Sequence, residues 1–464
     1  MSISFDAKGS PGKQGKTGVP LSRTAKNNPP RWIGDLVAGI AGIGFGIVCA
    51  TTFTSVTYSQ IKAPGGLAMF IGNLTAMVGT YLAMLMILLV SRLWIVEKNV
   101  WQDRLVSWHR KLGPWPISLL VAHAVFTTIG YSQSQKAGIL HEFVSVVTTF
   151  PNMLTATIGL ALMVLVGIAT IRAIRDRLKR ETWWTLHLFM YLALALSFAH
   201  EIGLGPTFVG HPLTTFFWVV AWLLTAGIII VFRIGFPIYR SISLKLKVVE
   251  VKNENDNIVS IVCRGHDVNR LKMDGGQFFC WRFLTKGMWY QSHPFSLSSL
   301  PRGDYIRLTV KDAGDFSSSL RNLKVGTRVA VEGPYGNFTK RFQIHKKAVF
   351  IAGGIGVTAL RSLTEDLPPK SNPIVVVRAS REEDLIFHDE LLELVKYRRG
   401  ELHELVGSRK DVEISAKSLL KISPDIAKRD VFVCGSSEFV NQIVSIAYSL
   451  GVNTNAIHHE AFAL

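Results

Sequence analysis

A chain of 464 residues is long enough for about two to four folding units and too long for a small binding module. Apolar residues make up 48% of it and charged residues only 18%, and the mean hydropathy is +0.28, which excludes a disordered chain and an ordinary soluble enzyme. The formal net charge of +18 is compatible with a nucleic acid or a membrane surface as partner, so the position of the charge has to decide.

Cysteine usage is sparse. The four cysteines are Cys49, Cys263, Cys280 and Cys434, and none forms a CxxC pair. A disulfide framework and a cysteine-ligated iron–sulfur cluster are therefore not expected. A redox metal in this chain would have to be held by histidine.

Apolar residues concentrate before residue 235 in stretches of about 20 residues, each long enough to cross a hydrocarbon layer of ~30 Å at 1.5 Å per residue. The six stretches span residues 34–53, 67–90, 112–131, 152–171, 183–202 and 213–232. The sequence therefore predicts a six-helix transmembrane bundle, with membrane lipid as its surroundings.

Basic residues are distributed unevenly around these spans. They fill the N-terminal tail, the loop between the second and third spans and the loop between the fourth and fifth, whereas the alternate loops hold only Lys62 and Lys136. By the positive-inside rule, both termini are cytoplasmic in a multi-pass protein of the cell membrane. Because the basic residues border lipid instead of forming one stripe with exposed aromatics, we expect no nucleic acid partner.

The pattern predicts four regions: a basic cytoplasmic tail at 1–33, the transmembrane bundle at 34–235, and two further domains. From residue 243 to 341, short alternating segments such as Leu244–Val248 and Ile306–Val310 predict an antiparallel β-barrel. From residue 345 to 464, apolar runs each followed by a helix-like segment predict an α/β domain with a parallel sheet. The runs are Ala348–Ala352, Ile374–Val377 and Val431–Cys434.

Four histidines fall in or beside two of the spans. His109 and His123 belong to the third, and His187 and His200 to the fifth. A single intramembrane histidine is usually a packed, hydrogen-bonded residue, but two pairs on two spans favour metal ligation. Both spans run outward, so the pairs lie at two levels ~20 Å apart. This arrangement predicts two stacked b-type haems, each with two axial imidazoles and no vacant site, which suits outer-sphere electron transfer.

The helical wheel tests this arrangement. At 100° per residue, the 14-residue step of the third span returns to within ~40° of its starting face, whereas the 13-residue step of the fifth misses by ~140°. Either the fifth helix is distorted or its two ligands approach their haems from different sides. Pro114 and Pro116 predict a kink after His109. Arg110 and Lys111 are candidates for the inner haem propionates, with simple interfacial cations as the alternative.

Three segments of the C-terminal half have the character of nucleotide sites. His293–Ser296 opens a strand, and Gly314–Leu320 resembles a helix start whose free N–H groups could receive a pyrophosphate. Gly353–Thr358 follows the strand 348–352 and precedes a helix, which is where a dinucleotide needs close backbone approach. The last segment does not fit GxGxxG, and glycine-rich turns also arise from packing alone. Val433–Gly435 ends a further strand at the same edge of the sheet.

The order of these pieces, from about residue 34 to 464, resembles the ferric reductase and NADPH oxidase family, in which a six-span two-haem domain is fused to a flavin and nicotinamide module of the ferredoxin reductase type. The resemblance rests on the two histidine spacings and on the segments 293–296, 314–320, 333–336, 353–358 and 434–435. It implies a multidomain membrane protein with FAD, two b haems and NADPH or NADH.

The resemblance also implies roles for individual residues. The flavin ring would be bordered by His293, Pro294, Phe295 and Ser296, with Ser296 nearest its reactive nitrogen, and the FAD diphosphate would be held by Ser317 and Ser318. The diphosphate of the nicotinamide nucleotide would be bound by Gly353, Gly354, Gly356 and Thr358, and the nicotinamide would lie beside Cys434 and Gly435. Phe462 is the candidate aromatic that covers the flavin, although Ala463 and Leu464 follow it, unlike in the eukaryotic oxidases.

Three residues after the second strand of the α/β domain bear on the choice of reductant. Arg378, Ser380 and Arg381 stand where a ribose 2′-phosphate would be read, and the planar fork of arginine suits a phosphate, which favours NADPH over NADH. The alternative is that Arg381 pairs at the surface with the acidic residues that follow it, 382–384.

We therefore expect electrons to pass from NADPH through FAD and the two haems to a small acceptor outside the cell. Molecular oxygen giving superoxide is the favoured acceptor and a chelated ferric ion the alternative, because the outer loops hold few hard oxygen ligands. His141 and His211 are candidates for acceptor contact. A haem-bearing membrane anchor, or a proton pathway with a nucleotide-sensing domain, explains the histidines but not the flavin segment. The sequence does not identify partner subunits.

Overall fold

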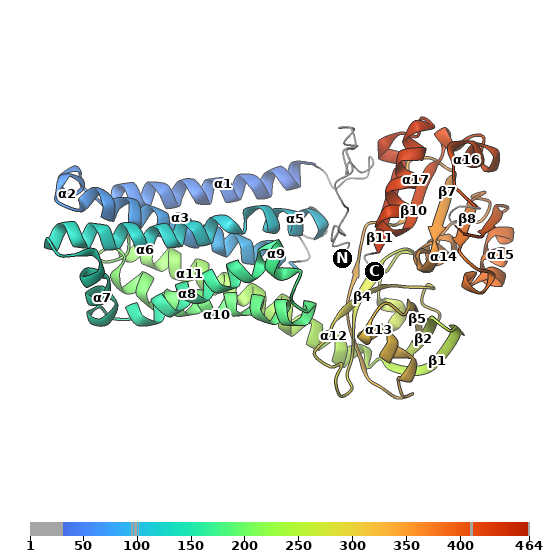
Figure 1. Ribbon diagram of the computed structural model, residues 1–464, viewed down its shortest axis with the longest axis horizontal. Coiled ribbons are helices and arrows are strands. Elements are labelled where there is room, and N and C mark those ends of the chain that lie inside the picture. The colour runs from blue at the N-terminus through green and yellow to red at the C-terminus, as the bar shows by residue number, and fades with distance from the viewer. Residues whose placement is uncertain (1–30, 94–95, 97–99, 101, 409–411, 463–464) are drawn as a thin grey trace. The chain divides into compact units, whose positions relative to one another are not determined.

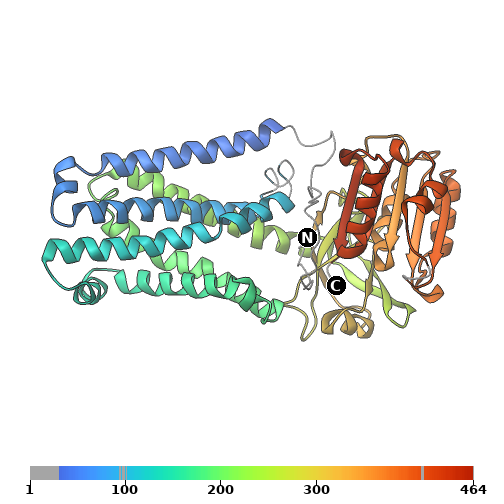
Figure 2. The same ribbon diagram turned by 45° about the horizontal axis from the view of Figure 1, so that its top comes forward.

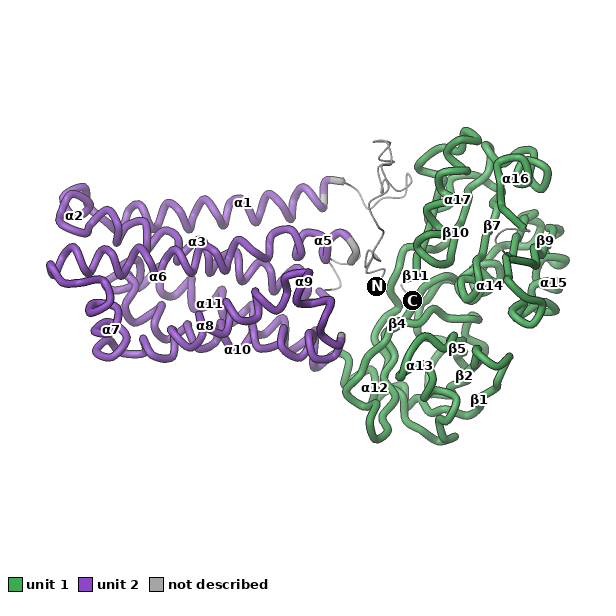
Figure 3. The backbone as a smooth tube through the Cα atoms, in the orientation of Figure 1, with its two compact units in different colours: residues 1–30, 236–464 green, residues 31–235 purple. Residues whose placement is uncertain are grey.

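The computed structural model describes residues 31–464 apart from 94–95, 97–99, 101, 409–411 and 463–464. The described chain forms two compact units, residues 31–235 and residues 236–464, shown in purple and green in Figure 3. Most of the predicted basic tail, and Ala463 and Leu464 after the candidate aromatic, lie outside the described residues.

The secondary structure of the first unit, where the structure describes it, is helical (Figure 1). Its elements are α1 (Arg31–Thr54), α2 (Tyr58–Lys62), α3 (Gly66–Val90), α5 (Gln102–Leu112), α6 (Pro114–Gln135), α7 (Ile139–Thr149), α8 (Met153–Thr170), α9 (Arg172–Arg175), α10 (Arg180–Leu204), α11 (Pro212–Ile229) and a π-helical turn (Ile230–Gly235). Figure 2 shows the long helices lying side by side.

Six of the helical stretches in the described chain are long and apolar enough to cross a membrane, which confirms the six predicted spans. They cover 34–54, 66–90, 104–135, 153–170, 181–204 and 212–244. The third span is built from α5 and α6, which meet at Gly113 with Pro114 at the first position of α6. A proline is tolerated at the start of a helix because its missing N–H is not needed there.

A six-stranded barrel opens the second unit. Its strands are β1 (Lys247–Asn255), β2 (Ile258–Arg264), β3 (Phe278–Phe283), β4 (His293–Ser296), β5 (Tyr305–Lys311) and β6 (Val329–Tyr335). They form two antiparallel sheets, β1-β2-β5 and β4-β3-β6. Bridges between Leu297 and Leu308 and between Lys247 and Arg328 close the ring. The interior is filled by large apolar side chains, including Phe279, Trp281 and Phe283, so the predicted antiparallel barrel is confirmed.

One sequence interpretation at the barrel's start is wrong. The predicted strand Leu244–Val248 begins only at Lys247, because Leu244 ends helix α12 (Phe236–Leu244) and Lys245 has a φ of 45°. The alternation arises because Leu244, Leu246 and Val248 all point into the barrel core. Burial on one side of an irregular segment therefore imitates a strand pattern.

The α/β domain contains five parallel strands in the order β11-β10-β7-β8-β9. They are β7 (Ala348–Gly353), β8 (Ile374–Ala379), β9 (Glu401–Val406), β10 (Asp430–Ser436) and β11 (Ile457–Phe462). Helices α14 (Val357–Glu365) and α15 (His388–Tyr397) cover one face, and α16 (Ala416–Ile422) and α17 (Ser437–Ser449) cover the other. The strand order reverses between β7 and β10, and ligands of such sheets bind outside the carboxyl ends of the strands at that point.

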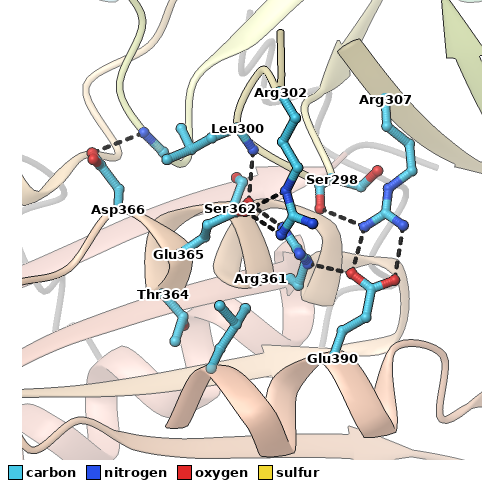
Figure 4. Close-up of polar contacts among 12 residues, drawn as sticks. Ser298, Leu300, Arg302, Arg307, Arg361, Ser362, Thr364, Glu365, Asp366 and Glu390 are labelled. Atoms are coloured by element: carbon cyan, nitrogen blue, oxygen red, sulfur yellow. Dashed lines mark hydrogen bonds and ion pairs between the residues drawn. The ribbon is translucent and has the colours of Figure 1, made fainter. Parts of the chain in front are cut away.

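A chain of alternating charges joins the barrel to the α/β domain (Figure 4). Glu365 of α14 accepts from Arg302 at 2.8 Å and from the Leu300 N–H at 2.8 Å, and it also pairs with Arg361. Arg361 lies 2.7 Å from Glu390 of α15, which accepts both terminal nitrogens of Arg307 at 2.8 Å. Arg302 and Arg307 belong to the barrel, whereas their glutamate partners belong to the α/β domain. Two of these ion pairs therefore cross the domain boundary.

Candidate functional site

The four predicted histidines meet in two pairs. The ring centroids of His109 and His187 lie 6.0 Å apart, and those of His123 and His200 lie 6.2 Å apart. Helix α10 is a continuous α-helix from Arg180 to Leu204. Because a 13-residue step on a regular helix turns by ~140° from the starting face, the two α10 imidazoles leave the helix on different sides. The structure thus rules out a distorted fifth helix, the first of the two alternatives that the wheel left open.

The spacing of each pair fits a metal held between two imidazoles. Imidazole nitrogens bind metal ions at about 2 Å, so two rings with centroids about 6 Å apart leave room for one metal ion between them. Among the described residues, no group of three or more His, Cys, Asp or Glu side chains could hold a metal ion. Two imidazoles alone leave most of a metal's coordination unfilled, and a planar macrocycle with four nitrogens would complete it.

Hydrogen bonds orient two of the four rings. The Nδ1 atom of His109 lies 3.0 Å from the Met86 carbonyl, and that of His123 lies 2.9 Å from the Gly72 carbonyl, both on α3. A carbonyl only accepts, so each Nδ1 carries the proton and Nε2 remains free to bind a metal. Gly72 permits the close packing of α3 against α6, since a Cβ at this position would press on Thr127.

The remaining predicted residues of the membrane unit lie at its ends. Arg110 and Lys111 are exposed in the last turn of α5, a position open to both of the alternatives proposed for them. His141 on α7 and His211 at the start of α11 are exposed as well.

The segment His293–Ser296 forms β4, which pairs with β3 in the barrel. Ser296 is 5% exposed, and its Oγ has no hydrogen-bond partner among the described residues. Because a buried hydroxyl without a partner is costly, this atom fits a position that a bound polar group satisfies. The His293 ring stacks on Phe316 with centroids 3.8 Å apart, and the Trp281 indole donates to the Phe295 carbonyl at 3.1 Å.

The two serines predicted to hold the FAD diphosphate lie on the short helix α13 (Asp315–Ser319). The Ser318 hydroxyl donates to Asp312 at 2.6 Å, and the Ser317 hydroxyl accepts from the Ala313 N–H at 2.8 Å. Both side chains thus hold the turn that precedes the helix. This leaves the backbone N–H groups of its first turn to receive a phosphate.

The glycine-rich loop follows β7 at the point where the strand order reverses. Gly354 is exposed, has a φ of 55° and leaves open space where a Cβ would stand. A Cβ at Gly356, in contrast, would overlap the carbonyl of Cys434. Thr358 is buried beneath the loop, and its hydroxyl donates to the Ile355 carbonyl at 2.9 Å. Gly354 therefore faces outward from the loop, while Gly356 packs the loop against β10.

The residues predicted to read a 2′-phosphate separate into two groups. Arg378 and Ser380 line a cavity of about 60 Å³ together with Gly354 and Lys311. Arg378 donates to the Ser380 hydroxyl at 3.2 Å. Arg381 instead pairs with Glu383 and Asp384 at the surface, which is the arrangement raised as the alternative for this residue.

Cys434, Gly435 and Phe462 lie on neighbouring strands at the same sheet edge, since β10 pairs with β11. Cys434 is fully buried, and burial together with the nearby Glu460 raises the pKa of its thiol. The thiol therefore stays protonated near neutral pH and is no nucleophile. Phe462 is partly buried and packs against the core cluster that contains Cys434.

Comparison with known proteins finds a matching family model in each of two parts of the chain. Residues 75–198 match the family model described as a ferric reductase like transmembrane component. Residues 243–339 match the model of a FAD-binding domain. The chain has the domain composition of a ferric reductase and NADPH oxidase type fusion. The fusion thus joins a ferric reductase type membrane component to a FAD-binding domain, which a parallel-sheet domain follows.

Three curated relatives each match a part of this chain. The reductase subunit of glycine betaine monooxygenase from Pseudomonas aeruginosa is 27% identical over 36% of this chain and 50% of its own length. The flavohemoprotein of Bacillus subtilis is 24% identical over 46% and 58%, and the ferredoxin reductase component of 3-ketosteroid-9-alpha-monooxygenase from Mycobacterium tuberculosis is 29% identical over 47% and 65%. The chain thus spans about half to two thirds of these relatives.

Solved structures give similar matches. The FAD/NAD-binding domain of nitric oxide dioxygenase from Vibrio cholerae is 25% identical, covers 47% of this chain and 99% of its own, and has a TM-score of 0.41. A ferredoxin NADP+ reductase from Neisseria gonorrhoeae is 18% identical over 47% and 98%, with a TM-score of 0.39.

Sequence reasoning missed three features of the fusion's site. Lys311, at the end of β5, lines the cavity of Arg378 although it belongs to the barrel. The carbonyls that orient His109 and His123 come from a helix more than 20 residues away along the chain. Trp183 stacks on His187 with centroids 5.3 Å apart. Only the tryptophan had a signal in the sequence, since residues four apart on a helix share a face.

Proposed function

We propose that the chain is a transmembrane NAD(P)H oxidoreductase of the cell membrane with both termini in the cytoplasm. The barrel domain would hold FAD, which would supply hydride acceptance from NADPH, and the two histidine pairs would hold b-type haems, which would supply one-electron transfer to an acceptor on the far side. Both kinds of cofactor are needed because nicotinamide gives two electrons and haem accepts one. The observation that supports it most is the meeting of four histidines in two pairs between membrane-spanning helices, on the same chain as a FAD-binding domain.

The residues of the chain supply positions and hydrogen bonds for this relay. The Met86 and Gly72 carbonyls fix the tautomer of His109 and His123, so that Nε2 of each ring is left for iron. The Ser296 hydroxyl, buried without a protein partner, can donate to the flavin ring. The exposed Gly354 would let the nucleotide approach the backbone at the edge of the sheet.

For the acceptor, we propose molecular oxygen, with a chelated ferric ion as the second candidate. The exposed outer histidines, His141 and His211, are not grouped with acidic side chains into a site for a metal ion in the described chain. A ferric ion prefers hard oxygen ligands, so a small neutral acceptor is favoured. Each NADPH would then reduce two oxygen molecules to superoxide. Rapid reduction of ferric chelates without any signal sensitive to superoxide dismutase would show that the ferric candidate is correct.

The cofactor content of the purified full-length protein tests the proposal. We expect about two b-type haems for each FAD, because each histidine pair holds one iron. Adding NADPH without oxygen should reduce the flavin and then both haems, as followed by the optical spectrum. A colourless protein, or haem that NADPH leaves oxidised, would exclude the relay.

Arg378→Ala should discriminate between NADPH and NADH. Arg378 lines the cavity at the sheet edge, and losing a charge-assisted contact to a 2′-phosphate costs about 1.5–3 kcal/mol, or roughly 10- to 100-fold in the KM for NADPH. The KM for NADH should stay unchanged, because NADH lacks this phosphate. Arg381→Ala is the matched control, since Arg381 is already paired with Glu383 and Asp384. A larger effect of Arg381→Ala would reverse the assignment.

A further inference from the structure

Two adjacent tryptophans in the first turn of α10 differ in their surroundings. Trp184 is 42% exposed. Trp183 is half-buried, and its indole stacks on the ring of His187 with 5.3 Å between the centroids and 26° between the planes. Trp183 therefore lies against one of the two imidazoles of the inner pair, His109 and His187, whereas Trp184 does not share this contact in the described chain.

The indole nitrogen of Trp183 is buried and has no hydrogen-bond partner among the described residues. An indole N–H can only donate, and a buried donor without an acceptor is costly. Tryptophans at a membrane interface usually direct this group to water or to lipid head groups, but the Nε1 atom of Trp183 is buried away from both. The atom is therefore suited to an acceptor that is bound inside the helical unit.

The charges around the inner pair indicate that this acceptor is an anion. Residues 172–181, which lead into α10, contain five basic residues and only two acidic ones, Asp176 and Glu181. On the other helix of the pair, Arg110 and Lys111 directly follow His109 in the last turn of α5. A donor among cations suits a negatively charged acceptor, because charge-assisted hydrogen bonds are about twice as strong as neutral ones.

We propose that the Trp183 indole N–H donates a hydrogen bond to a propionate of the haem held between His109 and His187. This inference rests on the proposed function, because it presumes a haem at the inner pair. It extends that function by assigning a residue of α10 to the anionic edge of the macrocycle. A b-type haem has two propionates, so the second is left for Arg110 or Lys111.

This hydrogen bond should influence both the binding and the redox potential of the inner haem. The loss of a hydrogen bond to a charged group weakens binding about 10- to 100-fold. A donor beside a propionate also offsets part of its negative charge, which favours the reduced iron. Removing the N–H should therefore speed the release of the inner haem and lower its midpoint potential.

Trp183→Phe in the full-length protein in detergent tests the proposal, because phenylalanine keeps an aromatic ring against His187 but has no N–H. Haem release is measured by transfer to apomyoglobin, and the two midpoint potentials by anaerobic redox titration. We expect about two haems per FAD, release of one of them about 10-fold faster or more, and a lower midpoint potential for that haem alone. Trp184→Phe is the matched control and should change neither quantity. An unchanged FAD content shows that each variant has folded.

Trp183→Leu separates the hydrogen bond from the stacking, because leucine supplies neither. If Trp183→Phe behaves as the wild type and only Trp183→Leu releases haem faster, the ring contact alone matters and the inference is wrong. It is also wrong if Trp184→Phe has the same effect as Trp183→Phe, or if both haems change together. In each of these cases the proposed function stands as long as NADPH reduces two haems, whereas a wild-type protein without haem would overturn both.

Discussion

Gly356→Ala is expected to lower the stability of the α/β domain by about 3 kcal/mol, and to reduce the rate at which NADPH reduces the flavin at least about 10-fold. A Cβ at this position would overlap the carbonyl carbon and oxygen of Cys434 and press on the Gly435 nitrogen. These are backbone atoms of the central strand β10, paired on both sides, so they cannot move aside. The loop would shift away from the sheet edge and carry the nucleotide with it.

Gly354→Ala is the control within the same loop. Its φ of 55° is left-handed, which costs an alanine about 1 kcal/mol, but its Cβ would meet nothing within 4 Å. We expect thermal unfolding close to that of the wild type together with a raised KM for NADPH, because the added methyl group stands on the outer side of the loop. If the two variants were equally unstable, the assignment of Gly356 to packing and Gly354 to ligand approach would be wrong.

Much of the fold could be predicted from local pattern. The six spans follow from runs of apolar residues, because a helix in lipid must be apolar along its whole length. The parallel sheet follows from runs such as Ala348–Ala352, which become the buried strands of the α/β domain. Patterns fail where burial is not tied to regular structure, as at Leu244–Leu246, which lines the barrel without belonging to a strand.

A helical wheel drawn for one helix cannot predict how the histidines of two helices pair. A wheel describes the faces of α10 but not the helices around it, so it could not tell whether His187 and His200 must share a face. The structure answers this through packing, since α5 and α6 present His109 and His123 to opposite flanks of a regular helix. The carbonyls that orient these rings were equally beyond prediction, because they depend on which turn of α3 lies alongside.

The charged chain between the two domains of the second unit was also invisible in the sequence, because its members are separated by up to 88 residues between Arg302 and Glu390. Burial acts to raise the pKa of Glu390, but Arg307 and Arg361 outweigh burial and lower the pKa to about 2. An unfolded glutamate has a pKa of about 4.3. The stabilisation from this lowered pKa is therefore present above about pH 4.3 and is lost as the pH falls towards 2.

Glu365→Gln should lower the free energy of unfolding of the second unit by about 3 kcal/mol. Glu365 is only 12% exposed and accepts from Arg302 and the Leu300 N–H of the barrel, while Arg361, its partner on α14, is 3% exposed. The neutral amide leaves the buried guanidinium with half of its counter-charge. Chemical unfolding of the full-length protein at pH 7, followed by flavin fluorescence, measures the loss.

The same substitution should slow hydride transfer while leaving the FAD content unchanged, because Glu365 joins the domain that binds the nucleotide to the barrel that binds the flavin. Glu390→Gln removes the charge at the other end of this ion-pair network. Because both glutamates pair with Arg361, the losses in unfolding free energy should not add in the double variant. Glu383→Gln, at a surface ion pair with Arg381, is the matched control and should change stability by no more than about 0.5 kcal/mol. Strictly additive losses for Glu365 and Glu390 would show that the two ends act separately, and that Arg361 does not couple the domains.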